Sequence, residues 1–563
     1  MTNPNEDYTL RGLLVTLATL IVLVVVSFIP PLEAGGVSLR RASVVSELIS
    51  HSDNDAAPEN EAQPEIDVSE FEIDLEEVAD KVAQTTAVAS PTAAATSASW
   101  EGIFEEQPTG ESVNTLDVED FDVALSDSVA FADYSDILPT AEQITPIESF
   151  GGDDFSAPLN RLYEKLIAGK QSVRVAFMGD SFVEGDILTA DLRELMQDTF
   201  GGGGVGFAPM ASPFTGFRQT VKTTSKGWTP YNIMQRKSTP EPYVNDYFVS
   251  GWVAKASSGA SVRWDMVDKR RHLQECRRAR LMFVCRTDAD LRIRLNEGEE
   301  RIFNFEGGDA VRQIVVEDDR ISSLELLVVS GAEGFTALGA DFDSVDGVSV
   351  DNLSIRSNNG QAMFWSNPAI NAQINTMRAY DLVILQYGLN IMQADRHDYS
   401  LYAQQVEKMI RFVESCFPGA AVLVMGVSDR SQKNEQGIVP VESAKDLSKW
   451  QRDAAEQCGA AFWNTYDAMQ KLGGMSKFVD NGWAGKDYTH INYAGGKQVA
   501  RALYHALLQG VQQYGEQLRE RMERSKPVIT TPVEIAPLEN GVEIKPLAID
   551  LAQSTDDKII ETE

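Results

Sequence analysis

The sequence predicts an α/β protein in which a doubly wound, flavodoxin-like parallel sheet of about five strands is interrupted by an inserted antiparallel β-sandwich of jelly-roll type. Three observations support this fold class. Short apolar runs alternate with segments of helical spacing near residue 180 and again after residue 346, which is typical of strand–helix units in a parallel sheet. The stretch between them has short alternating strands separated by turn residues. With 563 residues, the chain is also long enough for two or more folded units.

The first strand of the parallel sheet is the apolar run Val173–Met178, which ends at Gly179, where the backbone can turn sharply. Ser181 lies at the tip of this turn, and Leu188–Phe200 then has helical spacing. A serine between a strand and a helix is a recurrent nucleophile position, because its hydroxyl is exposed and amide N–H groups point towards it. On its own, a Gly-Asp-Ser turn is more typical of a structural turn or a helix cap.

The predicted inserted domain covers residues 205–345 and lies in the crossover after the first strand. Its short strands are expected at 281–285, 291–295, 301–305, 313–316 and 324–329. Two basic runs, Lys269–His272 and Arg277–Arg280, stand out in an acidic protein. They are consistent either with binding of an anionic glycan or with a strand edge guarded by charge. The insert is therefore a candidate carbohydrate-binding module.

The strand–helix alternation then resumes, so the α/β domain consists of two parts, 150–204 and 346–512. Its further strands are expected at 348–355, 381–387, 421–427 and 460–463, and its helices at 154–168, 367–378, 401–416, 443–458 and 494–510. Residues 513–563 are polar and contain proline, and we expect a mobile C-terminal tail.

The N-terminal part of the chain is expected to lie outside the folded domains. Gly12–Ile29 is an uncharged apolar run of 18 residues, so we expect residues 1–35 to be a membrane anchor or a signal segment. Residues 36–149 are predicted to form an acidic, disordered tether, since Asp53–Phe150 contains 25 Asp or Glu and a single basic residue, Lys81. We expect a single-pass inner-membrane protein of the cell envelope, with the bulk of the chain in the periplasm.

The four cysteines have no zinc-type spacing. Cys416 and Cys458 each end a predicted helix before a predicted strand, so they could form a disulfide or remain buried free thiols. No metal or nucleotide motif is present, and we expect no cofactor. With a formal net charge of −35, we also expect no nucleic-acid partner.

Polar residues follow the predicted strands at one edge of the sheet. Ser181 follows the first strand, Gly360 the second and Asn390 the third, and the carboxyl ends of parallel strands carry the ligand site in open α/β sheets. A serine nucleophile needs a base, and the chain has five histidines. His490 is the one in a loop that leads into the final helix, and Asp487, three residues earlier, can hydrogen-bond its Nδ1–H.

With these turns in order, the chain resembles the SGNH/GDSL hydrolase family over about residues 150–510. The residues that carry the resemblance are Gly179-Asp-Ser181 with Gly185-Asp186, then Gly360, then Gly388-Leu-Asn390, and finally Asp487-Tyr-Thr-His490. The resemblance implies that Ser181 is the nucleophile, His490 the base and Asp487 the acid that orients it. It further implies an oxyanion hole made by the backbone N–H groups of Ser181 and Gly360 and the side-chain amide of Asn390.

A β-sandwich in the first crossover is similar to the layout of peptidoglycan O-acetylesterases. Those enzymes tend to have a histidine after the serine and an acidic residue after the asparagine, where this chain has Phe182 and Ile391. The predicted triad is intact, so the resemblance still implies hydrolase chemistry. The two departures leave the acyl group and the sugar open.

Three functions are consistent with these residues. The first is a serine esterase that removes O-acyl groups, above all O-acetyl, from a cell-envelope polysaccharide or peptidoglycan through an acyl-enzyme. The second is a periplasmic O-acyltransferase that works with a membrane-bound O-acyltransferase and passes the acyl group to a sugar hydroxyl. The third is an inert, tethered glycan-binding protein.

Overall fold

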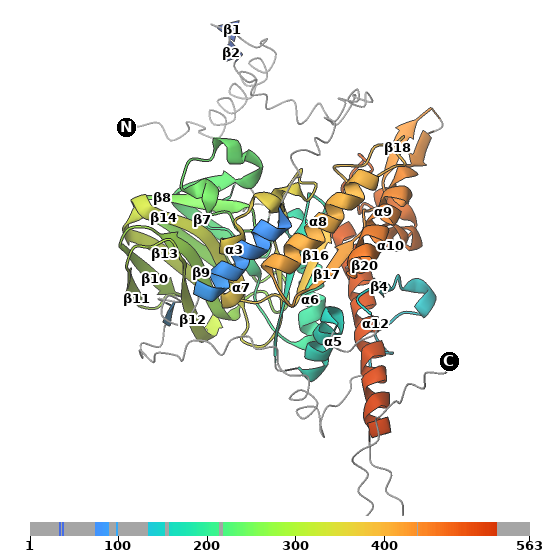
Figure 1. The fold of residues 1–563 in the computed structure, drawn as a ribbon, viewed down its shortest axis with the longest axis horizontal. Helices are drawn as coiled ribbons and strands as arrows, with labels where there is room; N and C mark the ends of the chain where they lie inside the picture. The colour runs from blue at the N-terminus through green and yellow to red at the C-terminus, as the bar shows by residue number, and fades with distance from the viewer. Residues whose placement is uncertain are drawn as a thin grey trace, which may run out of the picture. The chain divides into compact units, whose positions relative to one another are not determined.

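The computed structural model describes residues 33–34, 37–38, 74–88, 97–99, 133–152, 157–169, 171–212, 218–435 and 437–525 (Figure 1). The chain divides into two units, Met1–Glu70 and Phe71–Glu563. The first unit contains the short strand pair β1 (Glu33–Ala34) and β2 (Val37–Ser38). The predicted membrane segment Gly12–Ile29 lies outside the described residues, and none of the helices within them is long and apolar enough to cross a membrane.

The second unit contains a six-stranded mixed sheet that positions the candidate site. In spatial order its strands are β15 (Gly347–Asn352), β5 (Ser172–Gly179), β16 (Leu382–Gln386), β17 (Ala421–Met425), β20 (Ala461–Trp463) and β4 (Ile147–Ser149). The first five strands are parallel, and β4 is antiparallel to β20. The prediction of a purely parallel sheet of about five strands therefore missed an edge strand, which comes from a segment that we assigned to the tether.

Helices cover this sheet in two groups. In chain order they are α5 (Pro158–Ala168), α6 (Thr189–Phe200), α7 (Pro368–Met377), α8 (Ser400–Cys416), α9 (Ser443–Cys458), α10 (Thr465–Lys471), α11 (Gly474–Asp480) and α12 (Tyr493–Ser525). α12 packs against α5 and α6, whereas α8 packs against α7 and α9. α12 also continues to Ser525, so the C-terminal tail that we predicted from residue 513 begins as part of this helix.

The strands of the insert and one short strand from the N-terminal segment are hydrogen-bonded into a sheet of ten strands, which is antiparallel within the insert, and its arrangement as a sandwich stays a prediction. Its strands are β6 (Gly206–Ala208), β7 (Val221–Asn232), β8 (Trp252–Met266), β9 (Cys276–Cys285), β10 (Ala289–Leu295), β11 (Glu300–Phe305), β12 (Val311–Ile321), β13 (Ser323–Ser330), β14 (Phe335–Asp343) and β3 (Ser97–Ser99). β8 is 15 residues long and has three partners: β14 pairs with its residues 254–255, β13 pairs with its residues 261–265, and β7 pairs with both ends.

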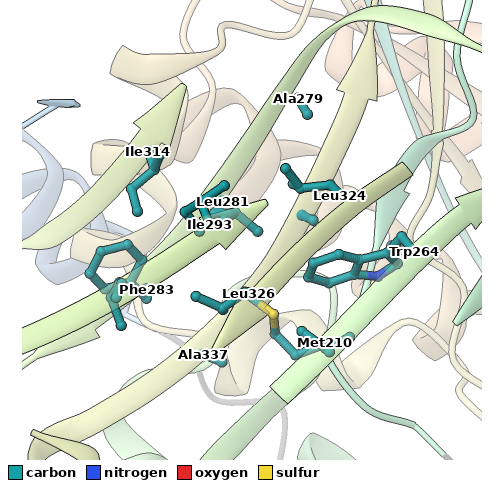
Figure 2. Close-up of a cluster of buried hydrophobic side chains, with 14 of the residues drawn as sticks. Met210, Trp264, Ala279, Leu281, Phe283, Ile293, Ile314, Leu324, Leu326 and Ala337 are labelled. Carbon is teal, nitrogen blue, oxygen red and sulfur yellow. The ribbon is translucent and has the colours of Figure 1, made fainter. Parts of the chain in front are cut away.

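The inserted sheet has its own apolar core (Figure 2). Trp264, Phe283, Ile293 and Leu326 are all fully buried in it. They come from four different strands, and inward-facing apolar residues alternate with more exposed ones along β10. This alternation is the pattern from which the sequence predicted an antiparallel module.

Ordered elements, among them one α-helix and two strands that pack on the folded domains, lie within the segment predicted to be a disordered tether. The helix α3 (Leu75–Val88) packs against α7 and α8 (Figure 1), with Val78 and Val82 buried. These two valines lie four residues apart, which places them on the same face of a helix. β3 adds to β12 in parallel, and β4 adds to β20. The acidic average composition of the segment concealed these short apolar patches.

A buried network of ion pairs joins the inserted sheet to the parallel sheet. Asp343 on β14 accepts hydrogen bonds from Arg174 on β5 and Arg278 on β9, each at 2.8 Å. Nearby, Arg280 pairs with Asp341 at 2.7 Å. These side chains come from both sheets and are almost completely buried, so the two sheets are held together through charge as well as apolar contact.

Basic residues of both runs in the insert form ion pairs with carboxylates of the same protein. Arg270, Arg271 and His272 pair with the acidic face of α6, through the side chains of Asp191, Glu194 and Asp198. This pairing explains the basic run Lys269–His272 without a glycan. The four cysteines, including Cys416 and Cys458, are free thiols in the structure.

Candidate active site

The turn after β5 presents Ser181 at the carboxyl edge of the parallel sheet. The last seven residues of β5 are buried, and Phe182 and Val183 are buried again directly after the turn. A Cβ atom at Gly179 would lie 2.5 Å from Val183 and 3.0 Å from the backbone oxygen of Gln386 on β16, so only glycine fits there. Ser181, between these buried residues, is partly exposed.

The strand order of the sheet reverses at β5. The chain passes from β5 to β15 on one side and then to β16 on the other. In open α/β sheets, such a reversal leaves a site at the carboxyl ends of the central strands. Ser181 follows the strand at which the order reverses, which supports a functional role for this edge.

Asp180, the residue before Ser181, is a fully buried carboxylate. Its Oδ1 accepts a hydrogen bond from the N–H of Phe182 at 2.9 Å, and its Oδ2 accepts one from Asn390 Nδ2 at 3.1 Å. Burial raises the pKa of Asp180 to about 7, although these hydrogen bonds and the charge of His490 act in the opposite direction. Asp180 therefore changes its charge near neutral pH.

Three strand ends meet through the side chain of Asn390. Its Nδ2 donates to Asp180 after β5 and to the backbone oxygen of Asn358 after β15, at 3.1 and 3.0 Å. Asn358 is buried, and its Oδ1 accepts hydrogen bonds from the N–H groups of Gly360 and Ala362 at 2.9 and 3.3 Å. Residues separated by up to 210 positions are thereby connected at one edge of the sheet.

Gly360 begins the short 3₁₀ helix Gln361–Trp365 and has a φ of 99°. A Cβ atom there would lie 2.0 Å from the sulfur of Met409 on α8, so any other residue would displace this side chain and would also be strained by the positive φ. The requirement for glycine at this position is therefore explained by both conformation and packing.

The three predicted oxyanion donors differ in their present partners. The N–H of Ser181 makes no hydrogen bond to any of the residues that the structure describes. The N–H of Gly360 is directed to Asn358, and both amide hydrogens of Asn390 are engaged by Asp180 and Asn358. Their role in an oxyanion hole remains a prediction, and it requires Gly360 and Asn390 to share or exchange these partners.

Asp487 and His490 form the predicted pair. His490 Nδ1 donates to Asp487 Oδ2 at 2.7 Å, and Asp487 Oδ1 accepts the N–H groups of Thr489 and His490, both at 3.1 Å. Partial burial alone would raise the pKa of Asp487, but the hydrogen bonds from His490 and Thr489 lower it to about 2. The hydrogen bond to Asp487 in turn raises the pKa of His490. The pair can therefore supply a basic Nε2.

The loop that carries this pair is held at both ends. The N–H of Gly485 donates to the backbone oxygen of His490 at 2.8 Å, and Ala484 and Ile491 form an isolated antiparallel bridge. The N–H of Ser431, after β17, donates to the backbone oxygen of Tyr488 at 3.1 Å. The tip of the loop is thus fixed to the same edge of the sheet as Ser181.

No hydrogen bond joins His490 to Ser181 within the described part of the chain. The charges of His490 and Asp180 nevertheless shift each other's pKa, so the imidazole is within electrostatic range of the residue before Ser181. Hydrogen bonds between a base and its nucleophile are often loose until substrate binds. The structure therefore forms the predicted pair, whereas its contact with Ser181, and with it the triad, remains a prediction.

A second His–Asp pair provides a comparison. His397 Nδ1 lies 2.6 Å from Asp446 Oδ2, but both side chains are largely exposed. The charge of the buried Asp180, beside Ser181, acts on His490. His397 instead contacts Asp446 through its ring and Trp450 through its backbone oxygen. Geometry within the pair therefore does not distinguish the two histidines, whereas their surroundings do.

Asp186 fixes the far end of the Ser181 turn. It is fully buried and contacts Arg193 and Arg218 at 3.3 and 2.8 Å, and Thr220 donates to it at 2.6 Å. Burial opposes ionisation, but the two guanidinium groups hold the pKa of Asp186 well below its usual range. Because Arg218 belongs to the segment that leads into the inserted sheet, this ion pair also connects the insert to the turn.

The two departures from the family pattern are both buried. Phe182 and Ile391 are only 1% and 3% exposed. With so little exposed surface, neither side chain is available to contact a substrate. The residues that differ from peptidoglycan O-acetylesterases are thus part of the packing.

Sequence reasoning missed Asp180 and Asn358, which hold Asn390 between them. The polar run Ser357–Gly360 and the acidic residue directly before Ser181 were the available signals. Among the described residues, no group of three or more His, Cys, Asp or Glu side chains is arranged to hold a metal ion.

No protein-family model matches this chain, and no curated protein matches it. Solved structures do. A peptidoglycan O-acetylesterase is 22% identical, with a TM-score of 0.53, and the match covers 65% of this chain and 99% of that chain. At the level of the fold, this match confirms the predicted resemblance to SGNH/GDSL hydrolases.

Two further solved structures match with low TM-scores. A lipase/acylhydrolase from Enterococcus faecalis is 19% identical, with a TM-score of 0.21, over 32% of this chain and 79% of that chain. A family two carbohydrate esterase from Cellvibrio japonicus is 8% identical, with a TM-score of 0.22, over 52% of this chain and 99% of that chain.

Proposed function

We propose that this protein is a serine esterase that removes O-acyl groups, in the first place O-acetyl groups, from a cell-envelope carbohydrate. The observation that carries the proposal is the hydrogen-bonded pair Asp487–His490 at the Ser181 turn, at the carboxyl edge of the sheet. The likeness of the fold to a peptidoglycan O-acetylesterase supports the choice of carbohydrate ester as substrate. The apolar N-terminal segment supports a location in the periplasm, attached to the inner membrane.

In the proposed reaction, Ser181 Oγ attacks the ester carbonyl while His490 Nε2 accepts its proton. The N–H of Ser181 and the donors of Gly360 and Asn390 stabilise the oxyanion, each being worth about 3 kcal/mol in the transition state. As the bond between the carbonyl carbon and the sugar oxygen breaks, protonated His490 gives its proton to that oxygen, and the sugar leaves with a free hydroxyl. Water, activated by His490, releases the acyl group from Ser181, and the free enzyme is restored.

The test is acetate release from an acetyl-ester reporter by the full-length protein and by variants. Ser181→Ala and His490→Gln are each expected to lower kcat by about 10⁴-fold or more, because both groups act in the same step. His397→Gln is the matched control, since His397 is hydrogen-bonded to Asp446 much as His490 is to Asp487. Equal losses for His397→Gln and His490→Gln would contradict the proposal.

An acceptor distinguishes hydrolysis from acyl transfer by the same residues. Rapid acetate release without a glycan acceptor supports the esterase, whereas turnover that requires the acceptor supports an O-acyltransferase that works with a membrane-bound partner. If a fluorophosphonate fails to label Ser181 and no ester is consumed, the protein is an inert glycan-binding protein and the proposed function is wrong.

A further inference from the structure

Arginines follow three strands of the parallel sheet at the edge where Ser181 lies. Arg356 follows β15, Arg396 follows β16 and Arg430 follows β17. The carboxyl ends of parallel strands lie at one edge, so these three residues belong to the loops around the candidate active site. Cations gathered at this edge contrast with the formal net charge of −35 for the whole chain.

Arg430 has a firmly held backbone. Its N–H donates to Asp429 Oδ1 at 2.8 Å, and its carbonyl oxygen accepts the N–H of Val441 at 2.8 Å. The next residue, Ser431, donates to the backbone oxygen of Tyr488 in the loop of Asp487 and His490. The guanidinium of Arg430 therefore starts from a fixed point beside the predicted acid and base.

The guanidinium of Arg430 is not neutralised by an ion pair. Its Nε is buried and donates no hydrogen bond, and no carboxylate among the described residues lies within 4.0 Å. The charge of Asp487 acts on it from a greater distance. A buried donor without an acceptor costs about 1–3 kcal/mol, so its presence in a site loop calls for a functional explanation.

Arg356 is a second arginine near His490. Its Nε and Nη2 both contact one oxygen of Glu184, at 2.8 and 2.6 Å, and its side chain is 56% exposed. The charge of Arg356 lowers the pKa of His490, so the guanidinium is close to the imidazole. Glu184 engages one edge of the guanidinium and leaves the other edge accessible.

We propose that the sugar carrying the acyl group also carries a carboxylate, and that Arg430 and Arg356 bind this carboxylate beside Ser181. This inference rests on the proposed esterase function and specifies its substrate class as an acidic carbohydrate ester. The planar fork of N–H donors in a guanidinium matches the two oxygens of a carboxylate, and partial burial strengthens the interaction. A carboxylate would also supply the acceptor that Arg430 Nε lacks among the described residues.

The test compares two acetylated oligosaccharides with the full-length protein, one built of uronic acids and one neutral. The ratio of their kcat/KM values is expected to favour the uronate ester and to decline as salt is added. Arg430→Gln and Arg356→Gln are each expected to reduce this ratio about tenfold or more, mainly through KM for the uronate ester. Arg430→Lys keeps the charge and should retain part of the preference. Arg411→Gln, an exposed arginine on α8 paired with Glu414, is the control.

The outcomes separate this inference from the proposed function. If the neutral ester is hydrolysed with dependence on Ser181, but neither salt nor Arg430→Gln changes the ratio, the esterase stands and the carboxylate site is wrong. If neither ester is consumed and Ser181 is unreactive, both proposals are wrong. A ratio that declines equally in Arg411→Gln indicates a general charge effect and also contradicts the site.

Discussion

Asp180 and Asp186 lie on either side of Ser181, six residues apart, and both are completely buried, yet they carry opposite charge preferences. Asp180 has hydrogen-bond donors but no arginine or lysine within ion-pair distance among the described residues, and its pKa is raised to about 7. Asp186 contacts Arg193 and Arg218, and its pKa is lowered. The comparison shows that partners, and not burial, decide which carboxylate remains ionised beside the nucleophile.

The largest effect is expected from removing the charge of Asp186. Asp186→Asn leaves the fully buried Arg193 without its counter-charge, and loss of one partner of a buried pair costs about 3–5 kcal/mol. Urea unfolding of Asp186→Asn and of the wild type measures the difference. Asp480→Asn, at the exposed end of α11, is the control and should change the free energy of unfolding by less than about 0.5 kcal/mol. A loss below about 1 kcal/mol for Asp186→Asn would show that the ion pair is not structural.

The raised pKa of Asp180 should make the stability of the protein depend on pH. Its folded-state pKa is raised, so its contribution to stability is complete below the unfolded-state pKa and is lost as pH rises through about 7. Asp180→Asn removes this dependence. Relative to the wild type, the variant is expected to gain about 3 kcal/mol between pH 5 and pH 8, measured by urea unfolding at both values. A difference between the two proteins that is constant with pH would mean that Asp180 does not titrate near neutrality.

The smallest effect concerns His490, which is close to both carboxylates and an arginine. Asp487 and Asp180 raise the pKa of His490, and Arg356 lowers it. Because His490 must be neutral to act as a base, ester hydrolysis should increase as pH rises through a pKa above 6.5. Arg356→Gln should move this limb to higher pH and reduce the rate at pH 6, relative to pH 9, by about twofold. Movement to lower pH would contradict the assigned position of Arg356.

The residues that the sequence predicted well are those whose signals are local. Ser181, Gly360 and Asn390 each follow a short apolar run, and Asp487 lies three residues from His490. The structure brings these segments to one edge of the sheet, as expected for parallel strands. Their catalytic roles remain predictions, but their placement follows from patterns of only a few residues.

What could not be predicted depends on contacts between distant segments. The pKa of Asp180 is raised by burial and is partly lowered again by the hydrogen bond from Asn390, 210 residues away. The charge of Asp186 depends on Arg218, from the insert side of the chain. Likewise, the joining of the inserted strands into one hydrogen-bonded sheet depends on β8 and its three partners. None of these pairings leaves a periodic pattern in the sequence.

The antiparallel strand β4 has a consequence for how this protein can be shortened. It covers the edge of β20, where Trp463 Nε1 donates to Thr145 at 2.9 Å and Arg452 pairs with Glu148 at 2.7 Å. A truncated protein that begins at residue 150, where composition suggests a domain boundary, would leave the backbone groups of β20 unpaired. Exposed strand edges recruit other chains, so such a truncation favours aggregation, whereas a start before residue 140 keeps this edge of β20 covered by β4.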